Sequence, residues 1–473
     1  MQSSSRRTLG FGLALLTLSF LPMAAQTESL EQQIEDLRTK LKDMDQLKQK
    51  LDELEQQFKA DEQKKQIADR QAAEKPKSTA SVSAGANGFV IQSEPSESAE
   101  GGSDFQLKVG ADIQTDVRTF EGSSNVPSLD QILLRRVRPT FSGTVYKYID
   151  FFIRPDFGQG QVLIYDVYAQ LNYFSRANLR VGKFKPPVGL ERLQSDDDTN
   201  FIERGLPTLL VPSRDLGYQL SGDLIKNRVN YSVGVFNGVA DNGLSDVSVS
   251  DHRDYAARLF LTPFQPDAGN LLRGLGVGIG SSFGNDDGVP LPSYKTFGQN
   301  TFFSFASGVT AAGHRTRLAP QAYYYLGPFG LLAEYTLAEE GFQKGTGASA
   351  VRRDIAFRSW QVQASYLLTR DRKVFGTLTP HRPFDPRNGG WGAIELAART
   401  GDWSAERGIY SYGFALPTAS PRDVREWVAG VNWYLNRMFR VSLDYGYTKF
   451  ENGAANGNRS PERALLERFQ INF

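Results

Sequence analysis

Hydrophobic and polar residues alternate one by one at the carboxyl end of the chain. Phe469, Ile471 and Phe473 alternate with the polar residues Arg468, Gln470 and Asn472. Successive residues of a β-strand point to opposite sides, so this spacing predicts a strand with one apolar and one polar face. Such a strand could belong to a membrane barrel or to the edge of a sheet in a water-soluble protein. The pattern of the rest of the chain distinguishes these two possibilities.

The alternation recurs as a predicted hairpin at residues 427–448. Apolar residues occupy alternate positions on both sides of a tight Asn436-Arg437 turn, with only Val428 out of pattern. These apolar positions are Trp427, Ala429, Val431, Trp433 and Leu435, then Phe439, Val441, Leu443, Tyr445 and Tyr447. Two such runs joined by a short turn indicate a β-hairpin with an apolar outer face.

Charged residues recur on the polar face of other predicted strands. Asp150 and Arg154 alternate with apolar residues in 149–154, and Asp166 opposes Tyr165 in 165–172. A dry sandwich core would not tolerate such charges unpaired, so this face is expected to line water. At about 23 residues per strand and connection, residues 105–473 predict an all-β membrane barrel of about 16 antiparallel strands.

A heptad pattern precedes this region. Within residues 26–74, apolar residues follow 4-3-4-3 spacing, and the seam then shifts by one residue, at Leu30, Ile34, Leu37, Leu41 and Met44, then Leu47, Leu51, Leu54 and Phe58. The spacing predicts an α-helical coiled coil that buries its stripe by self-association. A single solvated helix is the alternative. Residues 75–104, rich in Ser, Ala, Gly and Glu, are expected to form a linker.

One long apolar stretch lies near the start of the chain. Residues 9–20 follow Arg6-Arg7 and run into small residues ending at Ala25, which predicts a secretory signal peptide over residues 1–25. We interpret the resemblance of Ser5-Arg6-Arg7 to a twin-arginine signal as a chance match. Later in the chain, no run of about 20 apolar residues predicts a transmembrane helix.

Composition agrees with a barrel. The chain has 45 Gly, 31 Phe and 19 Tyr, and no Cys, which rules out disulfides and thiolate metal sites. A net charge of +1 gives no sign of nucleic-acid binding. Residues 105–473 hold 41 of the 54 basic residues and 36 of the 53 acidic ones, so the predicted barrel is slightly cationic.

Several segments, in order along residues 105–473, resemble the porin O and P family of Gram-negative outer membranes. They are LLRRVR (133–138), YDVY (165–168), VGKFKPPVGLE (181–191), FIER (201–204), PSRDLGYQLSG (212–222) and NWYLN (432–436). The resemblance implies a 16-stranded porin barrel, a homotrimer, and a channel for anions such as phosphate or pyrophosphate. In this family an amino-terminal coil also occurs. Residues 95–103 look like an insertion relative to the family, which affects where the barrel begins.

The resemblance also implies a ladder of arginines that leads to a constriction. Arg suits phosphate because its planar fork binds two oxygens at once. The residues expected along the anion path are Arg135, Arg136, Arg138, Arg154, Asp166, Lys183, Lys185, Arg204 and Arg214. By alternation Arg135 falls on the apolar face, so it either snorkels or sits near a bulge, and Lys183 and Lys185 have no clear orientation. Phosphate selectivity and a general anion preference both remain open.

The segment from 186 to 222 is too irregular for strand-turn-strand, since it contains Pro186-Pro187, Pro207 and Pro212. We expect it to fold into the lumen, where irregular backbone can face water, although an exterior loop is an alternative. Its triple Asp196-Asp197-Asp198 lacks the spacing of a recognised Ca²⁺ site.

Enzyme chemistry is poorly supported. Gly280-Ser281-Ser282-Phe283-Gly284 fits a nucleophile-elbow pattern, but it lies in a glycine-rich predicted strand rather than a strand-turn-helix. His252, His314 and His381 have no metal-ligand spacing, and no cofactor is expected. A barrel-embedded hydrolase using Ser282 and an outer-membrane anchor that tethers the envelope through the coil are the alternative functions.

The sequence therefore predicts a passive outer-membrane porin of a Gram-negative cell, with its coil in the periplasm. Expected partners are two further copies of the chain, outer-membrane lipid and small anionic solutes. The terminal Phe473 resembles the sorting signal that the outer-membrane barrel assembly machinery reads, so that machinery is also an expected partner.

Overall fold

We describe the fold from a computed structural model of the chain, in two units, Met1–Lys77 and Ser78–Phe473. The structure describes residues 30–73, 80–85, 88–93, 104–122, 128–241, 246–248, 250–267 and 269–473. The predicted signal peptide (1–25) and the predicted insertion (95–103) lie outside the described residues.

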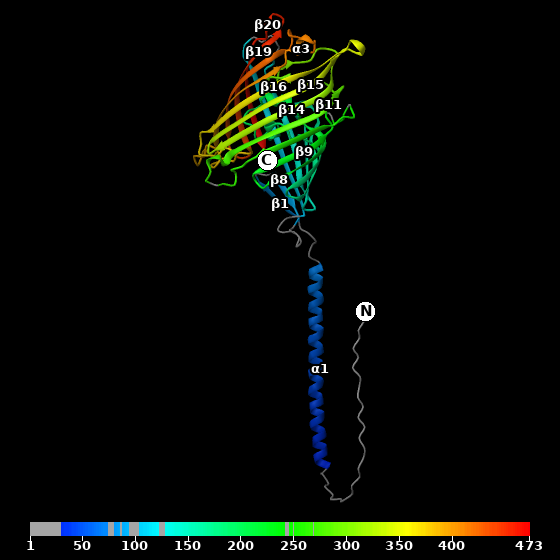
Figure 1. The fold of residues 1–473 in the computed structure, drawn as a ribbon. Helices are drawn as coiled ribbons and strands as arrows, with labels where there is room; N and C mark the ends of the chain where they lie inside the picture. The colour runs from blue at the N-terminus through cyan, green and yellow to red at the C-terminus, as the bar shows by residue number, and fades with distance from the viewer. Residues whose placement is uncertain are drawn as a thin grey trace. The chain divides into compact units, whose positions relative to one another are not determined.

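The first unit contains one helix, α1 (Leu30–Ala73), which covers the predicted heptad region (Figure 1). Its seam residues from Ile34 to Phe58 are 44–70% exposed. The helix therefore presents an apolar stripe that its own chain does not cover. Among the described residues, no helix is long and apolar enough to cross a membrane.

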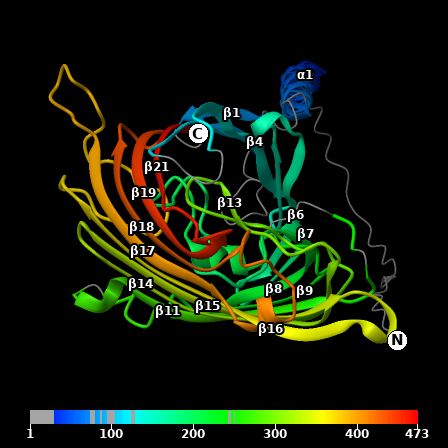
Figure 2. The ribbon, with the colours of Figure 1, turned by 90° about the horizontal axis from the view of Figure 1, so that it is seen from above.

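The second unit is a closed antiparallel β-barrel of sixteen strands (Figures 1 and 2). In chain order the barrel strands are β3 (Phe105–Phe120), β4 (Gln131–Val145), β5 (Ile149–Asp156), β6 (Leu163–Phe174), β7 (Ala177–Phe184), β8 (Asp215–Ile225), β9 (Val229–Phe236), β10 (Asp254–Leu261), β11 (Leu275–Asp287), β14 (Val309–Leu326), β15 (Phe329–Lys344), β16 (Val351–Leu367), β17 (Ala393–Ala405), β18 (Pro421–Tyr434), β19 (Phe439–Ala454) and β21 (Glu462–Asn472). Each strand pairs with the next, and β21 pairs with β3, with Gln470 opposite Gln114. The predicted fold class is confirmed.

Three short strands extend this sheet. β1 (Ser81–Gly85) and β2 (Gly88–Gln92) form a hairpin within the expected linker, and β2 pairs with β3 through Phe89 and Val109. The apolar residues around Phe89 thus continue the sheet beyond the end of β21. β20 (Gly457–Asn458) pairs with the end of β19.

The remaining elements lie in connections between barrel strands. They are η1 (Gly158–Gly160), α2 (Leu190–Leu193), η2 (Leu206–Leu210), η3 (Leu271–Gly274), the strand pair β12 (Tyr294–Lys295) and β13 (Thr301–Phe303), η4 (Gly347–Ser349) and α3 (Gly408–Ser411). β13 lies inside the ring of strands when the barrel is viewed from above (Figure 2).

The connections differ at the two ends of the barrel. The long-loop end carries the connections 121–130, 157–162, 185–214, 237–253, 288–308, 345–350, 406–420 and 455–461. The short-turn end carries 146–148, 175–176, 226–228, 262–274, 327–328, 368–392 and 435–438. Turn 368–392 is much longer than most others at its end, and its length was not predicted from the sequence.

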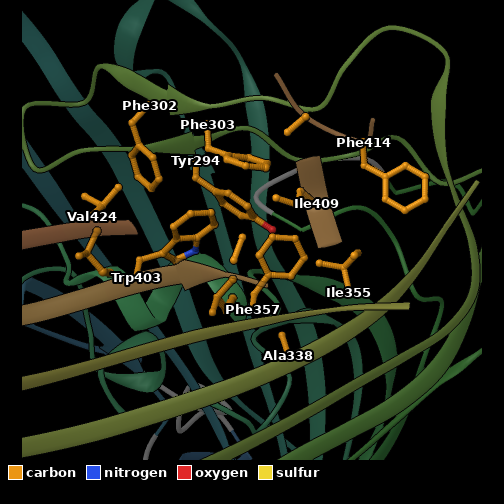
Figure 3. Close-up of a cluster of buried hydrophobic side chains, with 14 of the residues drawn as sticks. Tyr294, Phe302, Phe303, Ala338, Ile355, Phe357, Trp403, Ile409, Phe414 and Val424 are labelled. Atoms are coloured by element: carbon orange, nitrogen blue, oxygen red, sulfur yellow. The ribbon is translucent and has the colours of Figure 1, made fainter. Parts of the chain in front are cut away.

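An aromatic cluster fixes connection 288–308 inside the long-loop end (Figure 3). Tyr294 of β12 lies 5.2 Å, ring centre to ring centre, from the fully buried Trp403 of β17. Phe303 lies 5.2 Å from the same indole, and Phe357 of β16 lies 5.7 Å from it. Offset and tilted ring pairs of this kind stabilise packing beyond the area that they bury. The connection is therefore packed against the inner wall.

Candidate functional site

Segment 185–214 enters the barrel from the long-loop end and contacts the far wall. The Leu190 amide donates to Glu334 of β15 at 2.6 Å, and the Ile202 amide donates to Asp444 of β19 at 2.7 Å. The prediction of an inward-folded loop is confirmed for these residues. It is wrong for 215–222, which are paired in β8 with β7 and β9.

A glycine of β11, Gly280, makes room for this segment, while Gly276, Gly278 and Gly284 make room for neighbouring barrel strands. A Cβ on Gly280 would lie 2.1 Å from the carbonyl oxygen of Val188, closer than atoms can approach. The glycine-rich pattern of 274–284 is therefore a packing requirement. Ser282 of the suspected nucleophile elbow is 3% exposed, and its Oγ accepts from Arg317 at 3.1 Å.

Glu203 of the inward segment lies among three guanidinium groups of the wall. Arg135 donates from Nε at 2.8 Å, and Arg118 and Arg468 lie 3.5 and 3.8 Å from the same carboxylate. Arg468 also makes a bidentate pair with Asp116 at 2.7 and 2.8 Å. This group joins β3, β4 and β21 to the segment across the lumen.

Asp196 forms a second centre of the same kind. It accepts from Arg138 and Arg204, and Arg136 lies 3.7 Å away. Arg138 also donates to Asp156 at 2.7 Å. Together these two centres, which we call the arginine network, hold Arg118, Arg135, Arg136, Arg138, Arg204 and Arg468 around Glu203, Asp196, Asp116 and Asp156.

Two register shifts bring extra side chains to the arginine network. Arg135 is the unpaired residue where β3 and β4 slip, since Arg136 faces Gln114 and Leu134 faces Thr115. Such bulges redirect a side chain to the other face of a sheet. The bulge named as one of two alternatives for Arg135 is therefore present.

Tyr165 occupies the second register shift, between β5 and β6. Its ring is sandwiched by Arg138 at 3.9 Å and Arg214 at 3.5 Å from the ring centre. Arg214 also donates two hydrogen bonds to the Asp166 carboxylate, at 3.1 and 3.3 Å. The sequence placed Tyr165 on the face opposite to Asp166, which is wrong because the bulge turns both side chains to the same group.

The remaining predicted residues form no ion pair with the carboxylates of this network among the described residues. Arg154 donates to Thr140 at 3.1 Å on the inner wall of β5. Lys185 donates to the carbonyl of Gln194 at 2.8 Å within the inward segment. Lys183 shares its face with the apolar side of β7, donates to Ile164 at 2.8 Å and pairs with Asp246 at 2.5 Å. Lys183 is therefore held by connection 237–253 rather than by the arginine network.

Several members of the network were not among the residues predicted for the anion path. Arg118 and Asp116 lie on the polar face of an alternating strand, so that signal was available for them, and Arg468 lies on the polar face where the alternation of the last strand placed it. Glu203 and Asp196 lie in an irregular segment, where alternation says nothing about orientation. Their partners come from strands far away in sequence, and only the closed barrel brings them together.

Turn 368–392 reaches the inward segment from the opposite end of the barrel. Gln194 donates to the Phe375 carbonyl at 2.6 Å, and Lys373 donates to Asn200 at 2.7 Å. Lys373 also pairs with Glu395 of β17 at 2.6 Å. Two connections from opposite ends thus meet inside the barrel and narrow its lumen.

The electrostatics of the inward segment favour the ionised form of two of its acids, Glu203 and Asp196. Burial alone would raise the pKa of Glu203, but Arg135 lowers that pKa below its usual range. Burial opposes the charge of Asp196 as well, yet Arg204, Arg136 and Arg138 hold its pKa well below normal. Burial, helped by Arg204 and Arg214, holds the pKa of Lys185 well below normal, which disfavours its charged form.

Metal binding finds no support in the described part of the chain. It contains no group of three or more His, Asp or Glu side chains arranged to hold a metal ion. Asp196 instead accepts from arginines, and Ser195 donates to Asp197 at 3.1 Å. The triple Asp is thus part of the polar packing of the inward segment.

Comparison with known proteins matches residues 107–473 to the family model "Phosphate-selective porin O and P". Porin O of Pseudomonas aeruginosa is 24% identical over 418 residues, which cover 78% of this chain and 89% of that protein. The crystal structure of the outer membrane channel DcaP of Acinetobacter baumannii superposes with a TM-score of 0.53 at 10% identity, covering 79% of this chain and 99% of DcaP.

These matches agree with the closed barrel described above. They indicate a channel rather than an enzyme, and the barrel belongs in the outer membrane. The chain is therefore a member of the porin O and P family, an outer-membrane porin.

Proposed function

We propose that the barrel is a passive channel with a moderate preference for anions. The observation that carries this proposal is the arginine network, in which six guanidinium groups surround four carboxylates. A pore that replaces part of an anion's hydration needs such fixed positive charge. Asp112 and Asp197, both within 3.4 Å of Gln114 beside the network, offset this excess of two, so the preference also depends on luminal cations outside the network such as Arg154.

Pairing within the network argues for a general preference over strong selectivity for phosphate. Arg138, Arg204 and Arg468 already donate to carboxylates, so an entering phosphate has to compete for their donors. The family description supports phosphate as a solute. Arg154 lies on the inner wall with no ion-pair partner among the described residues, and it completes the proposed path together with Arg214.

A homotrimer is the proposed assembly. β5, β7, β9 and β10 have only eight residues each, whereas β14 has 18. An eight-residue strand tilted by about 40° spans about 21 Å, less than an apolar band of about 25 Å. Neighbouring barrels would cover this low wall. The exposed seam of α1 supports the same conclusion, because parallel helices from three copies would bury it as a coiled coil.

The same proposal sets the orientation in a Gram-negative outer membrane. Barrels of this class place short turns toward the periplasm and longer loops outside. The chain enters and leaves the barrel at the short-turn end, where the Phe473 amide donates to Ala111 at 3.1 Å. The coil would thus lie in the periplasm, lipid would contact the apolar outer face, and the assembly machinery would read the strand that ends at Phe473.

Reconstitution in planar bilayers tests the proposal. In a KCl gradient the reversal potential should shift toward the chloride equilibrium potential, with a chloride-to-potassium permeability ratio of a few-fold. Phosphate should block the chloride current only at millimolar concentration. Block at micromolar phosphate would replace a general preference with phosphate selectivity. A cation-side potential would contradict anion preference, and no conductance would favour the anchor alternative.

A further inference from the structure

A cavity of about 610 Å³ lies at the short-turn end, between the inner wall and turn 368–392. Its volume falls within the range of about 300–1,000 Å³ that is usual for small-molecule sites. It is separate from the arginine network, and its lining comes from turn 262–274, from the ends of β11 and β14, and from residues 372–375.

Three aromatic rings form one side of this cavity. Phe375 stacks on Tyr323 at 5.1 Å with planes 24° apart, and Tyr325 lies 5.1 Å from Tyr323. Phe260 supports them from behind, 5.3 Å from Tyr323. The rings are half-buried, so part of their surface remains open to a solute.

The inner wall is shaped to admit these rings. A Cβ on Gly276 would lie 2.5 Å from the Tyr323 ring and 2.7 Å from Phe260. A Cβ on Gly330 would lie 2.8 Å from the Lys373 side chain. Glycine at both positions therefore lets the aromatic wall and the inward turn pack where they do.

The cavity also has a consistent charge. Arg273, Arg372 and Lys373 line it, and no Asp or Glu is among its described lining residues. Lys373 is held by Glu395 and Asn200. The exposed Arg372 has no ion-pair partner in the described part of the chain, so its guanidinium is available to an anion.

We propose that this cavity binds organic anions that carry a flat apolar ring, of which an aromatic carboxylate is the simplest. The carboxylate would be bound by Arg372, with Arg273 adding positive charge, while the ring packs on Phe375 and Tyr323. Ring stacking contributes beyond the area buried, and a charge-assisted hydrogen bond is among the stronger polar contacts. Inorganic phosphate lacks the ring, so it would be held only by its electrostatic attraction to the arginines. The inference names a solute class for the channel and so rests on the proposed transport role.

Benzoate is the probe, and the full chain purified in detergent is the sample. Saturation-transfer NMR should detect benzoate binding, with acetate and uncharged benzamide each binding at least about tenfold more weakly. R372Q and F375L should each weaken benzoate binding by about tenfold. R387Q is the matched control, since Arg387 is an exposed arginine of the same turn that does not line the cavity.

Folding of each variant is checked by circular dichroism. Wild-type affinity for benzoate in folded R372Q and F375L would overturn the site, as would acetate or phosphate competing with benzoate at equal concentration. Because binding is measured without a membrane, its loss says nothing against conductance. A wild-type protein that binds benzoate but carries no current would contradict the proposed function alone.

Discussion

At the scale of single residues, two breaks in the strand pattern determine what lines the lumen. Arg135 and Tyr165 are both extra residues at register shifts, and both turn inward next to the inserted segment. Tyr165 holds Arg138 and Arg214 against its two faces, which keeps the guanidinium groups in place for an anion. The two bulges thus add the side chains of Arg135 and Tyr165 to the inner wall, where strict alternation would not place them.

Replacing Arg136 tests whether luminal arginines set the selectivity. Arg136 donates to Gln114 at 2.5 Å and lies 3.7 Å from Asp196. Arg136→Ala should lower the chloride-to-potassium permeability ratio about two- to threefold, because it removes one of the six network cations. Arg463→Gln, at an exposed arginine stacked on Tyr447, is the control and should leave the ratio unchanged. An equal ratio in both variants would remove Arg136 from the anion path.

Replacing Glu203 tests the same network by removing a negative charge instead of a positive one. Glu203→Gln leaves Arg135, Arg118 and Arg468 with one carboxylate fewer, so anion preference should rise by a similar factor. The measurement is again the reversal potential in a KCl gradient. A fall in anion preference would mean that Glu203 positions the arginines rather than neutralises them.

At the scale of elements, segment 185–214 depends on the absence of side chains opposite to it. Gly280→Ala places a methyl group 2.1 Å from the Val188 carbonyl and should displace the segment. We expect single-channel conductance to change and the thermal midpoint to fall by several degrees. Gly269→Ala is the control, since a Cβ there meets nothing within 4 Å. Unchanged conductance and midpoint in Gly280→Ala would contradict the packing described for the segment.

The acids of segment 185–214 also predict how stability depends on pH. The folded-state pKa values of Glu203 and Asp196 lie below the ordinary 4.5 and 3.8. Their contribution to stability is therefore fully present above about pH 4.5 and is lost as the pH falls through the lower folded values. Thermal midpoints should fall steeply below pH 4 in the wild type and less steeply in Glu203→Gln. Parallel curves for the two proteins would mean that Glu203 does not contribute to the pH dependence of stability.

At the scale of the whole molecule, alternation predicted the fold because each barrel strand repeats one rule over 8–18 residues. The local pattern could not show where that rule fails, so the bulges at Arg135 and Tyr165 required the paired strands. The β1–β2 hairpin was missed because its apolar run is only three residues long. The inward path of turn 368–392 was missed because its anchors, Asn200 and Gln194, are distant in sequence.

The helix and the barrel are separate units, and the proposed assembly predicts that they contribute differently. Deleting residues 30–73 should lower the thermal stability of the proposed trimer and leave single-channel conductance unchanged, because every residue of the arginine network belongs to the second unit. Native gels after heating and bilayer recordings measure the two properties. A change in conductance without loss of the trimer would contradict this division.

The reversal potential of the wild-type channel in a KCl gradient tests the central claim most directly. The arginine network, with six guanidinium groups around four carboxylates, predicts a reversal potential close to the chloride equilibrium potential and a chloride-to-potassium permeability ratio of a few-fold. A potential on the potassium side would show that the network does not govern which ions pass.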